Sequence, residues 1–228
     1  MIIMEEQKFK NIKIDSIFFD LDGTLVDSKD DIVEGVNYTL KKLGLESRDY
    51  EEIVLFIGGG VVDLIEKSVG KSDPKTIKKG VDIYKEYFSD HLNEKSTLYP
   101  GVKETIKYFK DKNLVVVTNR GKYLAEKALK GFGIIDYFKG VVGGDDEECL
   151  KPLACPINKG FEFFKGERER SMMVGDMVYD ILAGKAAGVI TCGVTYGIGK
   201  EKDLIEVRPD YMIDSIAQLK NVIIPRYN

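Results

Sequence analysis

IFFDLDGTLVDS is the stretch from Ile17 to Ser28, and it decides the fold. An apolar run stops at Asp20, and the Asp-Gly-Thr that follows turns the chain, which predicts a buried strand ending in a polar loop. Side chains two residues apart in a strand point the same way, so Asp20 and Asp22 should project together into the crevice beyond the strand's carboxyl end. Open α/β sheets bind ligands at that edge.

Asp20 and Asp22 are close enough to repel each other, and without a cation nearby they would share a proton. A divalent metal ion would remove the repulsion. On these residues alone, a solvated junction in which both aspartates cap an Asp-Gly turn is equally consistent with the pattern. The whole string, however, resembles the first motif of the haloacid dehalogenase (HAD) superfamily, DxDGTLxDS, which is matched at every fixed position from Asp20 to Ser28.

The composition is that of an ordinary soluble protein, with 228 residues of which 43% are hydrophobic and 32% charged. This length is enough for one large domain, or for a core with a small second domain. The net charge of -4 gives no electrostatic reason to expect nucleic-acid binding. No apolar run reaches the length of a membrane span, and charges interrupt residues 1–13, unlike a signal peptide. We therefore expect a cytoplasmic protein that binds neither nucleic acid nor membranes.

The three cysteines, Cys149, Cys155 and Cys192, are odd in number and lack CxxC spacing. They suggest neither a disulfide framework nor a zinc site, and buried thiols are expected. The single histidine, His91, falls in a polar helical stretch and is expected to be a surface or packing residue, because no second histidine accompanies it.

Strand and helix patterns alternate over most of the chain, which favours an α/β fold with a parallel sheet covered on both faces. No strand pattern interrupts residues 28–97, where the helical patterns cover 28–42, 51–56, 61–69 and 74–91. Pro100 and Gly101 then mark the return to alternation. Strands are expected at 16–21, 114–117, 141–142, 171–174, 190–194 and 211–213, and helices at 101–111, 123–130, 156–165, 178–187 and 215–222. The all-helical insert resembles the C1 cap of HAD proteins. The resemblance implies a Rossmann-like core at 1–27 and 98–228 and a small helical cap at 28–97.

Thr118 and Asn119 follow the apolar run 115–117, so they should lie at the same sheet edge as Asp20. A hydroxyl and a backbone amide at a strand end can donate to phosphate oxygens. Capping of the helix that begins near Tyr123 is the simpler reading of these two residues alone. The string resembles the second HAD motif, in which the Thr or Ser binds the phosphoryl group.

Lys151 and Pro152 follow the acidic stretch 143–148. A lysine lodged beside acidic residues would be held charged and could offset the charge of a nucleophile and a phosphate. Lys151 resembles the lysine of the third HAD motif, which is usually followed by Pro. The chain departs from its relatives just afterwards, since residues 153–156 read LACP where a His or Glu and then Pro is common.

Asp176 and Asp180 lie in a predicted strand, turn and helix start, where four-residue spacing places both on one face. Both could serve a cation, or Asp180 could be an acid in the first turn, favoured by the helix dipole. The string resembles the fourth HAD motif, GDxxxD. Met177 and Tyr179 depart from the Ser and the Asn or Thr often found there.

The resemblance implies a mechanism. Asp20 and Asp176, with the backbone carbonyl of Asp22, would bind Mg²⁺, which prefers oxygen ligands, and Asp180 is left open as a further ligand. Asp20 would attack phosphorus and form an aspartyl-phosphate, and Asp22 would act as the acid and then the base. Thr118 and Lys151 would stabilise charge on the transferring oxygens. Haloacid dehalogenases attack carbon and lack the second aspartate, so Asp22 favours phosphorus.

The segment from Phe56 to Leu64 resembles the cap loop of phosphoglycolate phosphatases, although a flexible turn between helices explains three glycines equally well. The resemblance implies a small phosphorylated metabolite, 2-phosphoglycolate, as substrate. Its expected contacts are Gly58, Gly59, Gly60, Thr118, Asn119 and Lys151. A pyrophosphatase of the same cap type and a β-phosphoglucomutase-like enzyme are the alternatives, but the Arg-Lys pair usual on the mutase cap turn is missing at 57–61. A non-catalytic binding module would be expected to lose one of the four motifs, and none is lost. Monomer and dimer both stay open.

Overall fold

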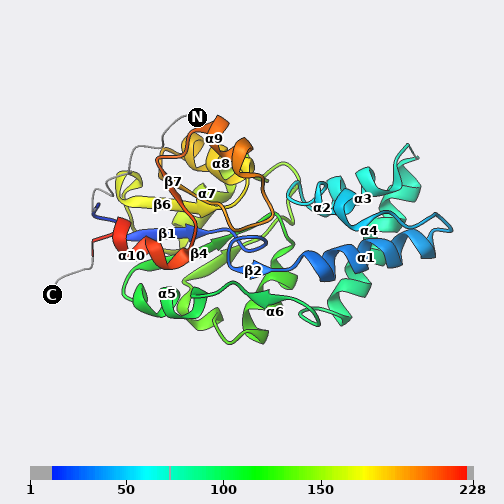
Figure 1. Cartoon of the computed structure of the whole chain (residues 1–228), viewed down its shortest axis with the longest axis horizontal. Coiled ribbons are helices and arrows are strands. Elements are labelled where there is room, and N and C mark those ends of the chain that lie inside the picture. The colour runs from blue at the N-terminus through cyan, green and yellow to red at the C-terminus, as the bar shows by residue number, and fades with distance from the viewer. Residues whose placement is uncertain (1–11, 72, 225–228) are drawn as a thin grey trace.

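The computed structural model describes residues 12–71 and 73–224. Figure 1 shows two parts, a sheet with helices on both of its faces and a group of helices, α1 to α4, at the other end of the molecule. The second part is inserted into the first, because the chain leaves the sheet after its first strand and returns to it later. The fold is therefore the predicted α/β core with a helical insert.

Within the described residues the main sheet has six parallel strands in the order β5-β4-β1-β6-β7-β8. In chain order these are β1 (Ser16–Phe19), β4 (Asn113–Val117), β5 (Gly140–Val142), β6 (Ser171–Gly175), β7 (Ile190–Val194) and β8 (Tyr211–Ile213). The register pairs Phe19 of β1 with Val116 on one side and Val174 on the other. The three central strands therefore end at the same edge, beside the point where the strand order reverses.

The side chains of β1 alternate between two apolar clusters, as the two-residue period of a strand requires. Ile17 and Phe19 pack in the cluster on one face and Phe18 in that on the other. The helices α5 (Val102–Tyr108), α6 (Lys122–Gly131) and α10 (Leu219–Val222) cover the first face, and α7 (Cys155–Gly160) and α8 (Val178–Ala187) cover the second (Figure 1). All of β1 is buried, which explains its uninterrupted apolar run.

The insert has its own apolar core, separate from the two clusters of the sheet. Its helices are α1 (Lys29–Lys42), α2 (Tyr50–Val54), α3 (Val61–Val69) and α4 (Pro74–Asp90). Its two connections to the sheet lie side by side, because β2 (Val26–Asp27) pairs antiparallel with β3 (Thr97–Leu98). The buried Asp31 fastens them, accepting hydrogen bonds from the backbone N–H groups of Lys95 and Ser96 at 2.9 and 3.0 Å.

Several elements differ from the sequence expectations. The strands β2 and β3 and the helix α9 (Glu201–Val207) were not expected, since a two-residue strand has no measurable period and α9 is short. The helix expected at 156–165 ends at Gly160 and continues as a 3₁₀ turn over Phe161–Phe163. His91 ends α4 and stacks on Tyr87, which confirms its packing role. Across 12–71 and 73–224, no helix is both long and apolar enough to cross a membrane.

Candidate active site

Three sheet strands end at the candidate site. Asp20 directly follows β1, Thr118 follows β4 and Asp176 follows β6. The backbone fixes two of these ends, because Asp20 donates its N–H to Val174 at 2.9 Å and Thr118 donates its own to Val142 at 3.0 Å. Lys151 reaches the same edge from the loop between β5 and α7. The expectation that Thr118 lies at the same sheet edge as Asp20 is therefore confirmed, and Asp176 and Lys151 lie at that edge as well.

Lys151 is buried and forms two short ion pairs across the site. Its Nζ donates to Asp20 Oδ1 at 2.5 Å and to Asp180 Oδ1 at 2.6 Å. Burial alone would lower the pKa of Lys151, but the charges of Asp180 and Asp20 outweigh it and raise that pKa, so the ammonium stays charged. The expectation that acidic residues hold this lysine charged is confirmed, but those residues are Asp20 and Asp180 and not the preceding acidic stretch. Asp146 in that stretch is exposed and pairs with Lys159 at 3.0 Å instead.

Asp20, Asp176 and Asp180 form a buried carboxylate cluster, each offering an oxygen within 4.8 Å of the others. Burial, Asp180 and Asp176 together raise the pKa of Asp20 well above its usual range, although Lys151 opposes them. Burial and the charge of Asp180 raise the pKa of Asp176 to about 6. Thr24 holds Asp176 in place, donating its hydroxyl to Oδ1 at 2.9 Å.

The donor set of this cluster fits a hard divalent cation. The three carboxylates and the ammonium of Lys151 have a formal net charge of −2. Burial and this uncompensated negative charge raise the pKa of Asp20 and of Asp176. All donors are oxygens, the ligands preferred by Mg²⁺. Asp180 has two contacts at once, since its Oδ2 accepts the Met177 N–H at 2.9 Å in the first turn of α8 while its Oδ1 faces Lys151.

Asp22 is held by a residue that the sequence reasoning missed. Arg120, in the loop after β4, donates from Nε to Asp22 Oδ2 at 3.0 Å and from Nη2 to Oδ1. Ser28 donates its hydroxyl to Asp22 Oδ1 at 2.5 Å rather than capping α1. The only available signal for Arg120 was its place directly after Thr118 and Asn119.

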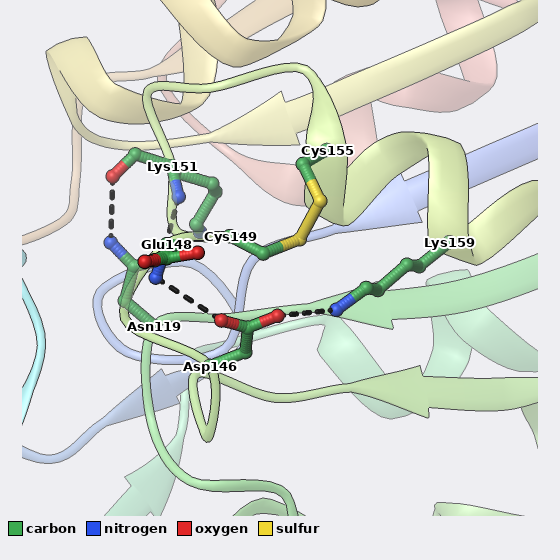
Figure 2. Close-up of a disulfide and its surroundings, with 7 residues drawn as sticks. All are labelled: Asn119, Asp146, Glu148, Cys149, Lys151, Cys155 and Lys159. Carbon is green, nitrogen blue, oxygen red and sulfur yellow. Dashed lines mark hydrogen bonds and ion pairs between the residues drawn. A yellow bond between two sulfur atoms is a disulfide. The ribbon is translucent and has the colours of Figure 1, made fainter.

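Asn119 joins three parts of the site. Its Oδ1 accepts the Lys151 N–H at 2.9 Å, and its Nδ2 donates to the Lys151 carbonyl at 3.0 Å and to the Gly58 carbonyl at 2.9 Å. Figure 2 shows Asn119 facing the backbone of Lys151. The side chain therefore positions both the loop of Lys151 and the glycine loop of the insert.

A disulfide joins Cys149 to Cys155 across the loop that carries Lys151 (Figure 2). The sequence expectation of three buried thiols is therefore wrong for this pair, and Cys192 alone is a buried free thiol. The six-residue separation places the two cysteines on either side of the turn at Lys151 and Pro152, where the chain reverses. Spacing rules for zinc and redox motifs do not anticipate such a pair.

Comparison with known proteins adds the family. Residues 17–194 match the model of the haloacid dehalogenase-like hydrolase family. The chain belongs to this family. It is 34% identical to the phosphoglycolate phosphatase of Haemophilus influenzae over 93% of this chain and 100% of that protein. It is 31% identical to the pyrophosphatase PpaX of Halalkalibacterium halodurans over 93% and 98% of the two chains. Its fold matches the crystal structure of a predicted phosphoglycolate phosphatase from Haemophilus somnus 129pt, with a TM-score of 0.86, 29% identity, and 92% and 98% of the chains covered.

The glycine loop of this HAD hydrolase rests on its fourth motif. A Cβ at Gly58 would overlap Met177 Sδ, and it would lie 3.1 Å from the Tyr179 ring. Gly58 also has a φ of +119°, which other residues rarely adopt. Met177 further packs against the apolar core of the insert. The two departures from the common fourth motif, Met177 and Tyr179, therefore form one of the contacts between the helical insert and the sheet edge.

A cavity lies between the sheet edge and the insert of this HAD hydrolase. The sheet side contributes most of the polar lining residues, among them Asp20, Asp22, Thr118, Asn119, Arg120 and Lys151, and α8 contributes Tyr179 and Asp180. The insert contributes apolar and aromatic side chains from three helices, among them Ile32, Val61, Leu64, Tyr84 and Phe88. Of the expected glycine contacts, Gly58 and Gly60 line the cavity, while Gly59 faces the side chain of Asp63.

Proposed function

We propose that this HAD hydrolase is a Mg²⁺-dependent phosphatase that hydrolyses 2-phosphoglycolate through an aspartyl-phosphate on Asp20. The observation that carries the proposal is the meeting of Asp20, Asp22, Thr118 and Lys151 at one cavity. The choice of substrate is supported by relatives named phosphoglycolate phosphatase, which align with between 88% and 94% of this chain. We further propose the cytoplasm as its location, and monomer and dimer both agree with this function.

In the first step Asp20 attacks phosphorus with one carboxylate oxygen, and the bond from phosphorus to the ester oxygen breaks. Lys151 Nζ lies 2.5 Å from Asp20 Oδ1. As Asp20 attacks, the ammonium can therefore stabilise the negative charge on the transferring phosphoryl oxygens. The Thr118 hydroxyl lines the same cavity and has a proton to donate to them.

Asp22 acts as the acid and then the base. It gives a proton to the departing alkoxide and later takes one from the water that attacks the aspartyl-phosphate, which releases phosphate and restores Asp20. Such catalysis requires a carboxyl group held at a fixed place. Ser28 and Arg120 supply that restraint from two directions.

Mg²⁺ would be held by Asp20, Asp176 and the backbone carbonyl of Asp22, with Asp180 close by. When bound, it supplies positive charge that offsets the buried carboxylates and the phosphoryl oxygens. We propose residues 28–97 as the cap and 1–27 with 98–228 as the core, of which 1–11 and 225–228 lie outside the described residues. The backbone N–H groups of 58–60 are proposed to face the substrate and, with the closed cap, to exclude water.

Pyrophosphate hydrolysis is the second candidate, and the similarity to a relative named pyrophosphatase PpaX favours it. The mutase alternative has no such support, because the Arg-Lys pair of its cap turn is missing from residues 57–61. The substrate panel below tests both alternatives.

The test is a substrate panel with Mg²⁺ that contains 2-phosphoglycolate, pyrophosphate, glucose 1-phosphate and an aryl phosphate. We expect the highest kcat/KM for 2-phosphoglycolate, no turnover by Asp20→Asn, and trapping of a phosphorylated wild-type enzyme by rapid acid quench. Higher activity on pyrophosphate than on 2-phosphoglycolate would identify a pyrophosphatase, and isomerisation of glucose 1-phosphate would identify a mutase. Binding of all esters without turnover would leave only a binding module.

A further inference from the structure

Arg120 has a donor that nothing in the described residues satisfies. Its side chain is only 7% exposed, and its guanidinium carbon lies 4.9 Å from the ring centroid of Phe88 on α4. Nε and Nη2 bind Asp22, but the buried Nη1 has no hydrogen-bond partner within residues 12–71 and 73–224. Leaving a buried donor unpaired is unfavourable, and more so when the group is charged.

The chemistry of the guanidinium explains how one residue can serve two groups. Arg120 has five N–H donors in a planar fork, and Asp22 uses one on Nε and one on Nη2. Both hydrogens of Nη1 remain for an acceptor. Since Arg120 lines the cavity, an anionic group bound there could take them without displacing Asp22.

A second cation faces the same cavity from the insert. Lys85 lies on α4, between Tyr84 and Phe88, and this solvent-exposed residue also contributes to the cavity lining. No ion pair engages Lys85 in the part of the chain that the structure describes. Lys151, by contrast, is neutralised by Asp20 and Asp180. Arg120 is itself paired with Asp22. Within the described residues, Lys85 therefore supplies the unpaired positive charge in this part of the cavity lining, and Arg120 supplies the unpaired Nη1 donor.

We propose that Arg120 Nη1 and Lys85 bind a carboxylate on the leaving alcohol of the substrate. The inference rests on the proposed function, in which Asp22 protonates the leaving oxygen. Because Arg120 is bonded to Asp22, the anion it recognises lies on the leaving-group side, away from the phosphoryl oxygens bound by Lys151 and Thr118. A carboxylate suits the planar fork of Arg120. The substrate class is then a phosphate monoester whose alcohol carries a carboxylate close to the ester oxygen.

The test compares 2-phosphoglycolate with ethyl phosphate, which has nearly the same size but lacks the carboxylate. The measured quantity is the ratio of the two kcat/KM values for wild type, Lys85→Gln, Arg120→Gln and Lys78→Gln. Lys78 is the matched control, because it is an exposed lysine two turns before Lys85 on the same helix but does not line the cavity. Losing a charged hydrogen bond should lower the ratio about 10-fold to 100-fold in Lys85→Gln and Arg120→Gln. Lys78→Gln should keep the wild-type ratio.

A purely positioning role for Arg120 gives a different result. If Arg120 only orients Asp22, Arg120→Gln slows both substrates equally, the ratio stays constant, and the proposal is overturned. It is also overturned if the same substitutions lower pyrophosphate hydrolysis more than 2-phosphoglycolate hydrolysis, because the second group would then be a phosphoryl group.

Direct binding separates this inference from the proposed function. The affinities of both esters are measured by calorimetry on Asp20→Asn and on Asp20→Asn/Lys85→Gln. If wild type turns over neither ester but Asp20→Asn prefers 2-phosphoglycolate through Lys85, the carboxylate site stands and the phosphatase proposal fails. If Asp20→Asn shows no preference between the two esters, the carboxylate site fails whatever the enzyme hydrolyses.

Discussion

The disulfide between Cys149 and Cys155 closes the loop on which Lys151 reaches Asp20, and its removal should affect stability more than turnover. The perturbation is the double substitution Cys149→Ala/Cys155→Ala. The two cysteines are six residues apart, so the cross-link closes a short loop of the unfolded chain. Loop-closure entropy for a loop of this length gives a loss of about 2 kcal/mol in the free energy of unfolding.

Turnover should change little, because Lys151 has other restraints. Asn119 holds its backbone through two hydrogen bonds, at 2.9 and 3.0 Å, and Asp20 and Asp180 hold its ammonium. None of these contacts involves a sulfur atom. The change in kcat should therefore stay below the contribution of one hydrogen bond, about 1 kcal/mol, which corresponds to about fivefold.

Urea unfolding measures the stability, and steady-state kinetics with an aryl phosphate measures kcat. Wild type in the presence of a phosphine reductant should match the double variant, while Cys192→Ala, which keeps the disulfide, shows only the cost of its own lost packing. Thiol titration in denaturant should count one thiol before reduction and three after it. Three thiols without reductant, or a collapse of kcat with unchanged stability, would refute the reasoning.

Three further predictions concern the same edge of the sheet. Asp22→Asn should lower kcat on the order of 10²–10⁴-fold while calorimetry shows phosphate affinity nearly unchanged. Because the folded-state pKa of Asp176, about 6, lies above its usual 3.8, the folded protein holds the extra proton between these values. In the absence of metal, the contribution of Asp176 to the free energy of unfolding should therefore fall as pH rises from about 4 to about 6 and stay level at higher pH. Mg²⁺ binds the ionised carboxylate, so it should raise Tm more above pH 6 than below it. Gly58→Ala should raise KM by misplacing the glycine loop against Met177, whereas Gly44→Ala, another positive-φ glycine with open space around it, should change stability alone.

Much of the site was predictable because it follows from strand ends. Asp20, Thr118 and Asp176 each come directly after a buried strand, and parallel strands in register bring such residues to one edge. The motif resemblance then identified which polar residues to follow. Neither step depends on side-chain packing, which is why both agreed with the structure.

The contacts that the sequence did not reveal are side-chain contacts between residues that lie far apart in the chain. Lys151 ignores the acidic residues beside it in the chain and pairs with Asp20 and Asp180, which are 131 and 29 residues away. Burial decides this outcome. Exposed carboxylates such as that of Asp146 are solvated, so an ion pair with one of them would stabilise the buried ammonium of Lys151 only weakly. Arg120 was missed for a similar reason, since only the folded chain brings it to Asp22.

Arg120 also links the two parts of the molecule. Its guanidinium stacks on Phe88, a buried residue of α4, while it holds the Asp22 carboxylate. Asn119, its neighbour, makes the same kind of link between Lys151 and Gly58. A helical insert displaced from the sheet edge would lose both contacts and would leave Asp22 and the loop of Lys151 less restrained. In the proposed reaction, closing the insert over a substrate would therefore both exclude water and complete the alignment of the acid and the lysine.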